Sequence, residues 1–293
     1  QLPIGYGRTF FSRSINWMYD TEPVPGLGGR ESYWPRGKVI GGSGSINAMV
    51  HVRGQPHDFE DWAALGNTGW GWDDVLPYFV KAEDHDLGQS AYHGAGGPQH
   101  VTDISSRAHP LCQTFIETGQ ALGLPFSPDL NSPTGEGVGI YQINTRKGCR
   151  ASSANEYLRP ALRRGGVDIR TKAHATRILF DGTRAIGVEY RRGNKLHQVR
   201  ASREVILSGG SVNSPQLLNL SGIGDAAHLK ALGIDIVANA PAVGQNMQDH
   251  LAVSYFYKTS VPTLNDELRP LFGKIKAGLH YLLNRGGPLS MSV

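Results

Sequence analysis

The sequence has few features of a membrane protein, a disulfide-rich domain or a nucleic-acid-binding protein. It contains no run of about 18 apolar residues, the length that a helix needs to cross the bilayer core. Its two cysteines, Cys112 and Cys149, lie in no CxxC pair and have no histidine-rich neighbours, so neither a disulfide framework nor a zinc site is expected. Its 29 basic and 25 acidic side chains are spread along the chain, so no nucleic-acid partner is expected.

The composition favours a globular protein with many tight turns. Hydrophobic residues make up 39% of the chain, which is enough to build a core. The 38 glycines gather in clusters such as Gly41-Gly42 and Gly209-Gly210, where tight turns or close backbone approaches are expected. The scarcity of cysteine favours a reducing compartment, so we expect a cytoplasmic protein, with peripheral attachment to the inner membrane as an alternative. The chain begins with Gln1, and we expect a segment upstream of it.

Hydrophobic periodicity predicts several helices. Two are expected between Asp58 and Glu83, the second opening at Asp73, and others are expected at about 110–122 and 271–284. The last of these is basic and amphipathic. In the first 50 residues, Lys38-Val39-Ile40 is expected to be extended and to lead into a Gly-Ser loop.

The middle of the chain predicts a capped helix followed by a β-meander. Ser152 or Ser153 can cap a helix that runs to about Arg164, and Glu156 completes a capping box with Ser153. A further helix is expected at 214–220, with Pro215 in its first turn. The alternating apolar segments between these two helices predict strands at 167–171, 176–180, 185–191, 196–201 and 204–208.

Two segments have the residue types of a nucleotide-binding site. Gly37–Asn47 runs from Lys38-Val39-Ile40 into a loop of small residues, whose backbone amides can face a phosphate or a planar ring. Gly210–Gly224 joins a strand end to a helix whose N-terminus carries the positive end of the helix dipole. A plain Gly-Ser turn and an ordinary strand-to-helix crossover are the alternatives.

Taken together, the two segments resemble the two signature motifs of the glucose-methanol-choline (GMC) oxidoreductase family. The first motif departs from the family pattern at His51, where an aromatic residue or alanine is usual. The resemblance covers nearly the whole chain and is greatest to choline dehydrogenase-like members. Other family-like stretches are Asn16–Leu27, Asp58–Trp62, His93–Pro98 and Val243–His250.

The resemblance implies an α/β (α+β) fold, with a Rossmann-like FAD-binding domain that includes the β-meander and part of a substrate-binding domain. The family begins such a domain with a GxGxxG turn, which is absent from this sequence. We therefore expect the N-terminal GxGxxG unit and a C-terminal segment to be missing. The expected division assigns 1–106 and 148–258 to the FAD-binding domain, and 107–147 and 259–293 to the substrate-binding domain.

The activity that the resemblance implies is FAD-dependent oxidation of a primary alcohol to an aldehyde by hydride transfer to flavin N5. The partners would be a small alcohol substrate and an electron acceptor, either oxygen or a carrier; the oligomeric state is left open. Ile46 stands where some members attach FAD through a histidine, so noncovalent FAD is expected. The alternative is a truncated, flavin-free shell of the fold that acts as a binding or structural protein.

The residues carried over from the family contact the cofactor, and none is catalytic. The family's active-site histidine lies beyond Val293, and neither His250 nor the histidines at 51, 93 and 100 inherit its role, so this chain alone is expected to be inactive. Cys149 is expected to be structural. The predicted cofactor-binding residues are Arg36, Gly37, Val39, Gly41, Gly42, Ser43, Asn47, Ala48, Met49, Val50, Ala175, Gly209, Gly210 and Ser211.

Overall fold

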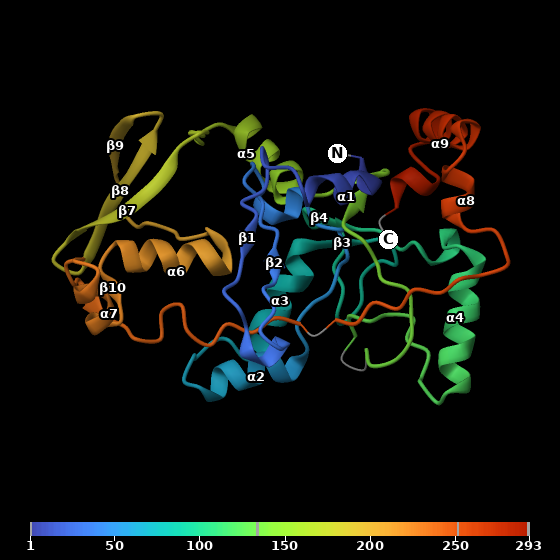
Figure 1. Cartoon of the computed structure of the whole chain (residues 1–293), viewed down its shortest axis with the longest axis horizontal. Helices are drawn as coiled ribbons and strands as arrows, with labels where there is room; N and C mark the ends of the chain where they lie inside the picture. The colour runs from blue at the N-terminus through green and yellow to red at the C-terminus, as the bar shows by residue number, and fades with distance from the viewer. Residues whose placement is uncertain (1, 133–134, 251, 292–293) are drawn as a thin grey trace. The chain divides into compact units, whose positions relative to one another are not determined.

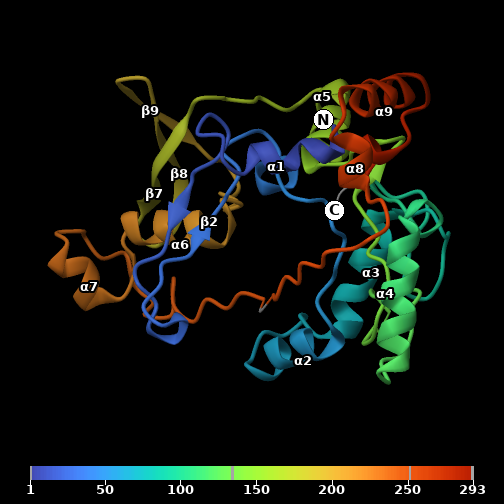
Figure 2. The ribbon, with the colours of Figure 1, turned by 45° about the vertical axis from the view of Figure 1, so that its right-hand side comes forward.

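The computed structural model describes residues 2–132, 135–250 and 252–291, and the chain divides into two compact units (Figures 1 and 2). The first unit comprises residues 1–167 and 258–293, and the second comprises residues 168–257. The units are described separately. The predicted four-part division into FAD-binding and substrate-binding domains stays a prediction.

The second unit is a three-stranded antiparallel meander with a helix beside it. Both ribbon views show α6 next to the sheet (Figures 1 and 2), and the buried Ser221 hydroxyl, just after this helix, accepts a hydrogen bond from the Ile178 amide at 2.8 Å. The predicted β-meander is confirmed for its three central strands. The elements of this unit are β7 (His174–Asp181), β8 (Arg184–Arg192), β9 (Lys195–Arg200), α6 (Gly210–Leu220), β10 (Ile223–Gly224), α7 (Ala226–Ala231) and β11 (Ala238–Asn239).

Three predictions for this unit are wrong. The segments 167–171 and 204–208 have β-forming side chains but no strand partner among the described residues, and a strand needs a neighbour to satisfy its backbone groups. Helix α6 begins at Gly210, four residues earlier than predicted, so Pro215 lies inside the helix and not in its first turn. Ser214, the predicted first residue of the helix, accepts a hydrogen bond from the Gly209 amide at 3.0 Å.

The helices of the first unit agree closely with the periodicity of the sequence. Aspartates cap the N-termini of two of them: Asp58 and Asp74 accept hydrogen bonds from the Gln55 and Gly71 amides. The predicted helices at 110–122 and 271–284 are confirmed. The helices of this unit are α1 (Tyr6–Thr9), α2 (Pro56–Ala64), α3 (Trp72–Ala82), α4 (Pro110–Ala121), α5 (Arg159–Arg164), α8 (Leu264–Leu268) and α9 (Leu271–Asn284).

The centre of the first unit consists of short strand pairs and a small apolar core. Met49, Ile104 and Ile143 form the buried cluster, and Ile143 also makes isolated β-bridges to Val50 and Thr102. This arrangement places the end of the first motif against residues 142–145. The strand pairs are antiparallel β1 (Tyr19–Asp20) with β2 (Tyr33–Trp34), parallel β3 (Glu83–His85) with β4 (Gln99–Val101), and antiparallel β5 (Thr145–Arg146) with β6 (Cys149–Arg150).

Two predictions for the first unit are wrong. Lys38-Val39-Ile40 forms no strand, and a 3₁₀ turn, Gly42–Ser45, follows it. The capping box at Ser153 does not form, because the Ser153 hydroxyl donates to the Gly41 carbonyl at 3.3 Å and Glu156 pairs with Arg146 at 2.9 Å. A π-helical turn, Ala154–Leu158, leads into α5 instead.

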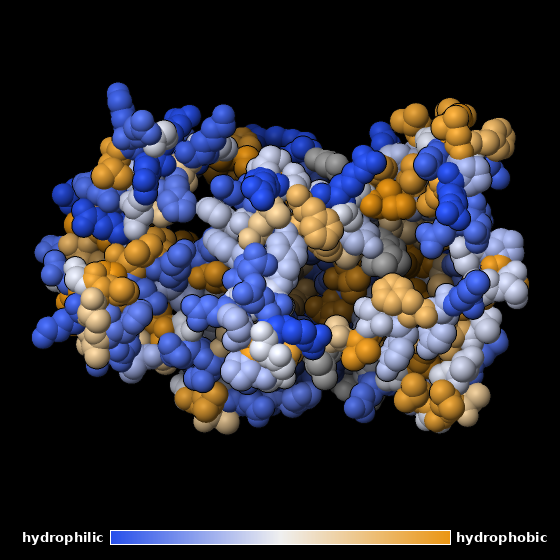
Figure 3. Space-filling model, viewed as in Figure 1, coloured by the Kyte–Doolittle hydropathy of each residue, from blue (hydrophilic) through white to orange (hydrophobic). Residues whose placement is uncertain are grey.

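No helix in the described part of the chain is long and apolar enough to span a membrane. Helix α9 nevertheless carries exposed apolar side chains, among them Leu271, Phe272 and Leu283. Orange, hydrophobic spheres gather over α9 in Figure 3.

Candidate functional site

The first motif forms a surface loop, residues 36–50, in which glycine is required by close packing. We call it the first-motif loop. A Cβ atom at Gly37 would overlap the backbone of Gly42. Gly41 has φ +89°, a backbone region that other residues rarely adopt, and a Cβ there would lie 2.9 Å from Ala154 Cβ. A side chain at either glycine would therefore force the loop to open.

The turn at Asn47 is fixed by a buried arginine. Arg150 Nη1 donates to Asn47 Oδ1 at 2.7 Å and to the Gly44 carbonyl at 3.2 Å. Asn47 Oδ1 also accepts from the Met49 amide at 3.1 Å. Burial lowers the pKa of Arg150 to about 10, so the guanidinium is still charged at neutral pH.

The end of the first-motif loop is held by residues from the centre of the first unit. Met49 is 1% exposed and has φ +65°, which a non-glycine residue adopts only where its surroundings impose it. The Asn144 amide donates to the Met49 carbonyl at 2.8 Å, and the His51 amide donates to the Gln142 carbonyl at 2.9 Å. Tertiary contacts therefore set the backbone on both sides of Val50.

The outer face of the first-motif loop offers apolar side chains and backbone to solvent. Val39, Ile40 and Val50 are exposed, while the Ser43 hydroxyl accepts a hydrogen bond from the Gly37 amide at 3.1 Å. The Arg36 guanidinium lies 5.1 Å from the centre of the Trp34 ring. The structure thus brings the ten predicted residues from Arg36 to Val50 together on one loop.

Val50 also lines an apolar cavity of about 490 Å³ in the first unit. The walls come from helix α4 and from the segment before β5, with Phe115, Ile116, Tyr141 and Ile143 among the lining residues. The cavity has room for a small molecule beside the end of the first-motif loop.

The other four predicted residues lie in the second unit. Ala175 is opposite Tyr190 on β8, next to a register shift in β7. Gly209, Gly210 and Ser211 are exposed at the N-terminus of α6, where helix geometry leaves the first amides without carbonyl partners inside the helix. Gly210 has φ +86°, and a Cβ there would meet nothing.

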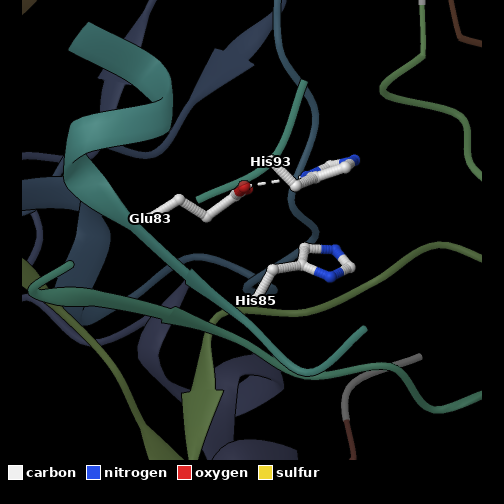
Figure 4. Close-up of side chains that lie close together, drawn as sticks. All are labelled: Glu83, His85 and His93. Carbon is white, nitrogen blue, oxygen red and sulfur yellow. Dashed lines mark hydrogen bonds and ion pairs between the residues drawn. The ribbon is translucent and has the colours of Figure 1, made fainter. Parts of the chain in front are cut away.

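A buried set of charged residues in the first unit was not predicted from the sequence. His51, Arg53, Glu83, His93 and Asp129 form it, and we call it the Glu83 network. Glu83 is 2% exposed, and its carboxylate lies 3.0 Å from His51 Nε2, 2.7 Å from Arg53 Nη2 and 2.7 Å from His93 Nδ1. His93 Nε2 lies 2.8 Å from Asp129 Oδ2. Figure 4 shows Glu83 and His93 joined, with the His85 ring beside them.

These contacts set the charges in the Glu83 network. Burial would raise the pKa of Glu83, but hydrogen bonds from His51 and His93 and the charge of Arg53 outweigh it and hold that pKa well below its usual range. Burial would lower the pKa of His93, but its hydrogen bonds to Asp129 and Glu83 raise the pKa to about 9. At neutral pH, His93 is therefore a cation between two carboxylates.

The same contacts argue against a metal ion. Glu83, His85 and His93 have potential ligand atoms within 4.8 Å of one another. Both ring nitrogens of His93, however, already carry protons bound by carboxylates, and a metal ligand must be deprotonated. Arg53 also places a positive charge against the one carboxylate that this cluster offers. We therefore interpret it as an ion-pair network.

Sequence patterns gave little sign of the Glu83 network, because its members lie far apart in the chain. His51 and Glu83 are 32 residues apart, and His93 and Asp129 are 36 apart. The signals were the family-like stretch His93–Pro98 and the departure from the family pattern at His51. By contrast, His250 is exposed, and its amide donates to the neighbouring Asp249 side chain. Cys149 Sγ lies 3.6 Å from Tyr281 Oη.

Comparison with known proteins now decides the family. The family described as GMC oxidoreductase matches residues 14–252. The chain belongs to the GMC oxidoreductase family. It is 48% identical to the mitochondrial choline dehydrogenase of Homo sapiens over 91% of this chain and 45% of that protein. It is 44% identical to the oxygen-dependent choline dehydrogenase of Brucella canis over 98% of this chain and 52% of that one.

A solved structure has the same fold over this chain. An FAD-dependent oxidoreductase from Chaetomium thermophilum superposes with a TM-score of 0.88 at 29% identity, over 99% of this chain and 52% of that one. These matches confirm the predicted family and α/β fold class, and they support FAD as the predicted cofactor. The chain spans about half the length of these relatives.

Proposed function

We propose that this chain is the flavin-binding part of an FAD-dependent enzyme that oxidises a primary alcohol, choline or a choline-like compound, to the aldehyde. The observation that carries the proposal is the first-motif loop. Gly37 and Gly41 let the loop pack closely on Gly42 and Ala154, and its exposed apolar side chains suit a planar ring. The tertiary contacts of Asn47 and Met49 keep it in one shape.

In this proposal the two groups of predicted residues have different tasks. Arg36, Gly37, Val39, Gly41, Gly42, Ser43, Asn47, Ala48, Met49 and Val50 lie beside the isoalloxazine and the pyrophosphate. Gly209, Gly210 and Ser211 offer the amides of a helix N-terminus, which favours anions such as phosphate. Ala175 lies at the adenine end, where backbone groups hold the base.

We further propose that FAD is bound without a covalent link. Ile46 occupies the position from which some family members attach the flavin. Its side chain is 2% exposed and has no nucleophilic atom. Bound FAD would supply the acceptor for the hydride that leaves the alcohol. The residues of this chain would hold and orient it and exclude water from its face, and no residue is assigned to take the alcohol proton.

The alcohol and the electron acceptor are inferred from the relatives. Choline dehydrogenases are among the similar proteins, which supports a choline-like substrate and either oxygen or a carrier as the acceptor. A cytoplasmic location belongs to the same proposal.

Two measurements test the function in the protein that contains this chain. Purified protein should carry flavin, and choline should bleach its visible absorbance when oxygen is removed. Benzyl and aliphatic alcohols serve as comparison substrates, and reoxidation with and without oxygen identifies the acceptor. A colourless protein that takes up no FAD would contradict the proposal and favour a flavin-free shell that acts as a binding protein.

A further inference from the structure

His51 directly follows the first-motif loop, and all its polar atoms have partners. The Asn144 side-chain amide lies 3.1 Å from His51 Nδ1 and can only donate, so Nδ1 accepts and the proton is on Nε2. That proton faces Glu83 Oε1 at 3.0 Å. The His51 amide donates to Gln142, and the His51 carbonyl accepts from Asn131 Nδ2 at 3.0 Å. His51 is thus fixed by its ring and its backbone together.

The orientation of Glu83 depends in turn on the far side of the Glu83 network. His93 Nδ1 holds Oε2, the oxygen that does not contact His51, and the Gly94 amide donates to the same oxygen at 3.1 Å. Asp129 holds the opposite edge of the His93 ring. A continuous chain of hydrogen bonds therefore runs from Asp129 through His93 and Glu83 to His51.

We propose that His93 is a positioning residue for the flavin-facing end of the first-motif loop, acting through Glu83 on His51. The inference rests on the proposed function, because it takes residues 47–50 as the part of the loop that touches FAD. Without His93, the Glu83 carboxylate loses the shorter of the two contacts to Oε2 that fix its rotation. The His51 Nε2 proton then loses a fixed acceptor. Because His51 is no longer held in place, the left-handed turn at Met49, two residues before it, becomes less constrained.

A second histidine offers a matched control. His100 is also held between two carboxylates, with Nδ1 2.9 Å from Asp84 and Nε2 3.2 Å from Asp86. It lies on β4, next to the strand that carries Glu83, and is 18% exposed compared with 9% for His93. The partners of these two aspartates include Gly96, Arg146 and Asp103, none of which belongs to the first-motif loop.

Hydrogen exchange on the flavin-free chain tests the positioning role without reference to the cofactor. In His93→Gln, peptides covering residues 47–51 should exchange about tenfold faster than in the wild type, as expected for loss of a buried hydrogen bond. In His100→Gln, the same peptides should exchange at the wild-type rate. Equal rates in both variants, or faster exchange spread evenly over the first unit, would overturn the inference.

Flavin binding provides the second readout. FAD should bind His93→Gln about tenfold more weakly than the wild type, because the first-motif loop is in the binding conformation in a smaller fraction of the molecules. The visible circular dichroism of the bound flavin should also change. His100→Gln should match the wild type. If the wild type itself binds no FAD while the exchange result holds, the proposed function fails and the loop-positioning role stands. If all three proteins bind FAD alike, the inference about His93 fails and the proposed function stands.

A milder variant covers the case in which His93→Gln does not fold. Asp129→Asn changes the outer end of the Glu83 network, where the side chain is 22% exposed, and keeps an oxygen for the Asn131 amide. It should accelerate exchange at residues 47–51 by a smaller factor than His93→Gln, again with His100→Gln unchanged. Wild-type exchange in Asp129→Asn would contradict the inference.

Discussion

The two motifs of this chain are held in place by different means. The second motif is mostly a helix, whose backbone groups pair within α6, and the Ser221 hydroxyl joins it to the sheet. The first-motif loop has almost no regular structure, and contacts from Asn144 to Met49 and from Arg150 to Asn47, about 100 residues away, fix it. Some backbone groups of this loop find their partners far away in the chain: the Met49 carbonyl accepts from the Asn144 amide, and the Gly44 carbonyl accepts from the Arg150 side chain.

Among these substitutions, Glu83→Gln should cause the largest loss of folding stability. It leaves Arg53 and the His93 cation without their shared carboxylate, which costs about 3–5 kcal/mol for a buried pair. Urea unfolding followed by tryptophan fluorescence reports on the first unit, because all five tryptophans lie there.

The matched control for this change is Glu189→Gln in the second unit. Glu189 also pairs with an arginine, but Arg177 is half exposed, so the loss should be much smaller. A Glu83→Gln protein as stable as Glu189→Gln would mean that the first-motif loop does not depend on buried charge.

The stability of the first unit should fall as the pH rises from about 6.5 to 9. The folded pKa of His93 is raised to about 9, so the protonated ring stabilises the fold fully below its unfolded pKa of 6.5. The loss over this range should be about 3 kcal/mol. Urea midpoints measured from pH 6 to 10 check this, and His93→Gln should flatten the profile. A profile that is already flat in the wild type would rule out a charged His93.

Two glycine replacements, one in each motif, compare the packing of the two motifs directly. Gly41→Ala combines a left-handed φ with a close approach to Ala154, and it should cost about 2–3 kcal/mol. Gly210→Ala has a similar φ but open space, so about 1 kcal/mol is expected. Thermal unfolding followed by tryptophan fluorescence measures the first change, and far-ultraviolet circular dichroism measures the second. Equal effects would show that the first-motif loop is less tightly packed than its contacts indicate.

A change that stays within the second unit is expected for Ser221→Ala. It removes the acceptor of the buried Ile178 amide and should cost about 1–2 kcal/mol. Hydrogen exchange at Ile178 should accelerate while residues 47–51 are unaffected. Faster exchange at the first-motif loop would show that the two motifs are not held independently.

The sequence predicted what depends on local pattern. Periodicity and capping residues located α3, α4 and α9, and turns between alternating segments located β7 to β9. It failed for 167–171 and 204–208, where β-forming side chains lack a partner strand. It also failed at Ser153 and Glu156, which bind Gly41 and Arg146 instead of each other.

In the candidate site, too, the features with a local sequence pattern could be predicted, and those that depend on tertiary contacts could not. Its glycines stand out in the sequence because they cluster, whereas the Glu83 network joins residues with no common pattern. The contact between Asn144 and His51, for example, spans 93 residues. Such long-range pairs come from tertiary packing, and a single sequence carries no local signal of them.

Titration of the chain with FAD, followed by the quenching of flavin fluorescence, tests the central claim most directly. The account predicts saturable binding by the wild type, much weaker binding by Gly41→Ala, and complete release of the flavin when the protein is precipitated with acid. Absence of binding by the wild type, or equal binding by Gly41→Ala, would contradict the role of the first-motif loop. Flavin that stays with the precipitated protein would contradict noncovalent attachment.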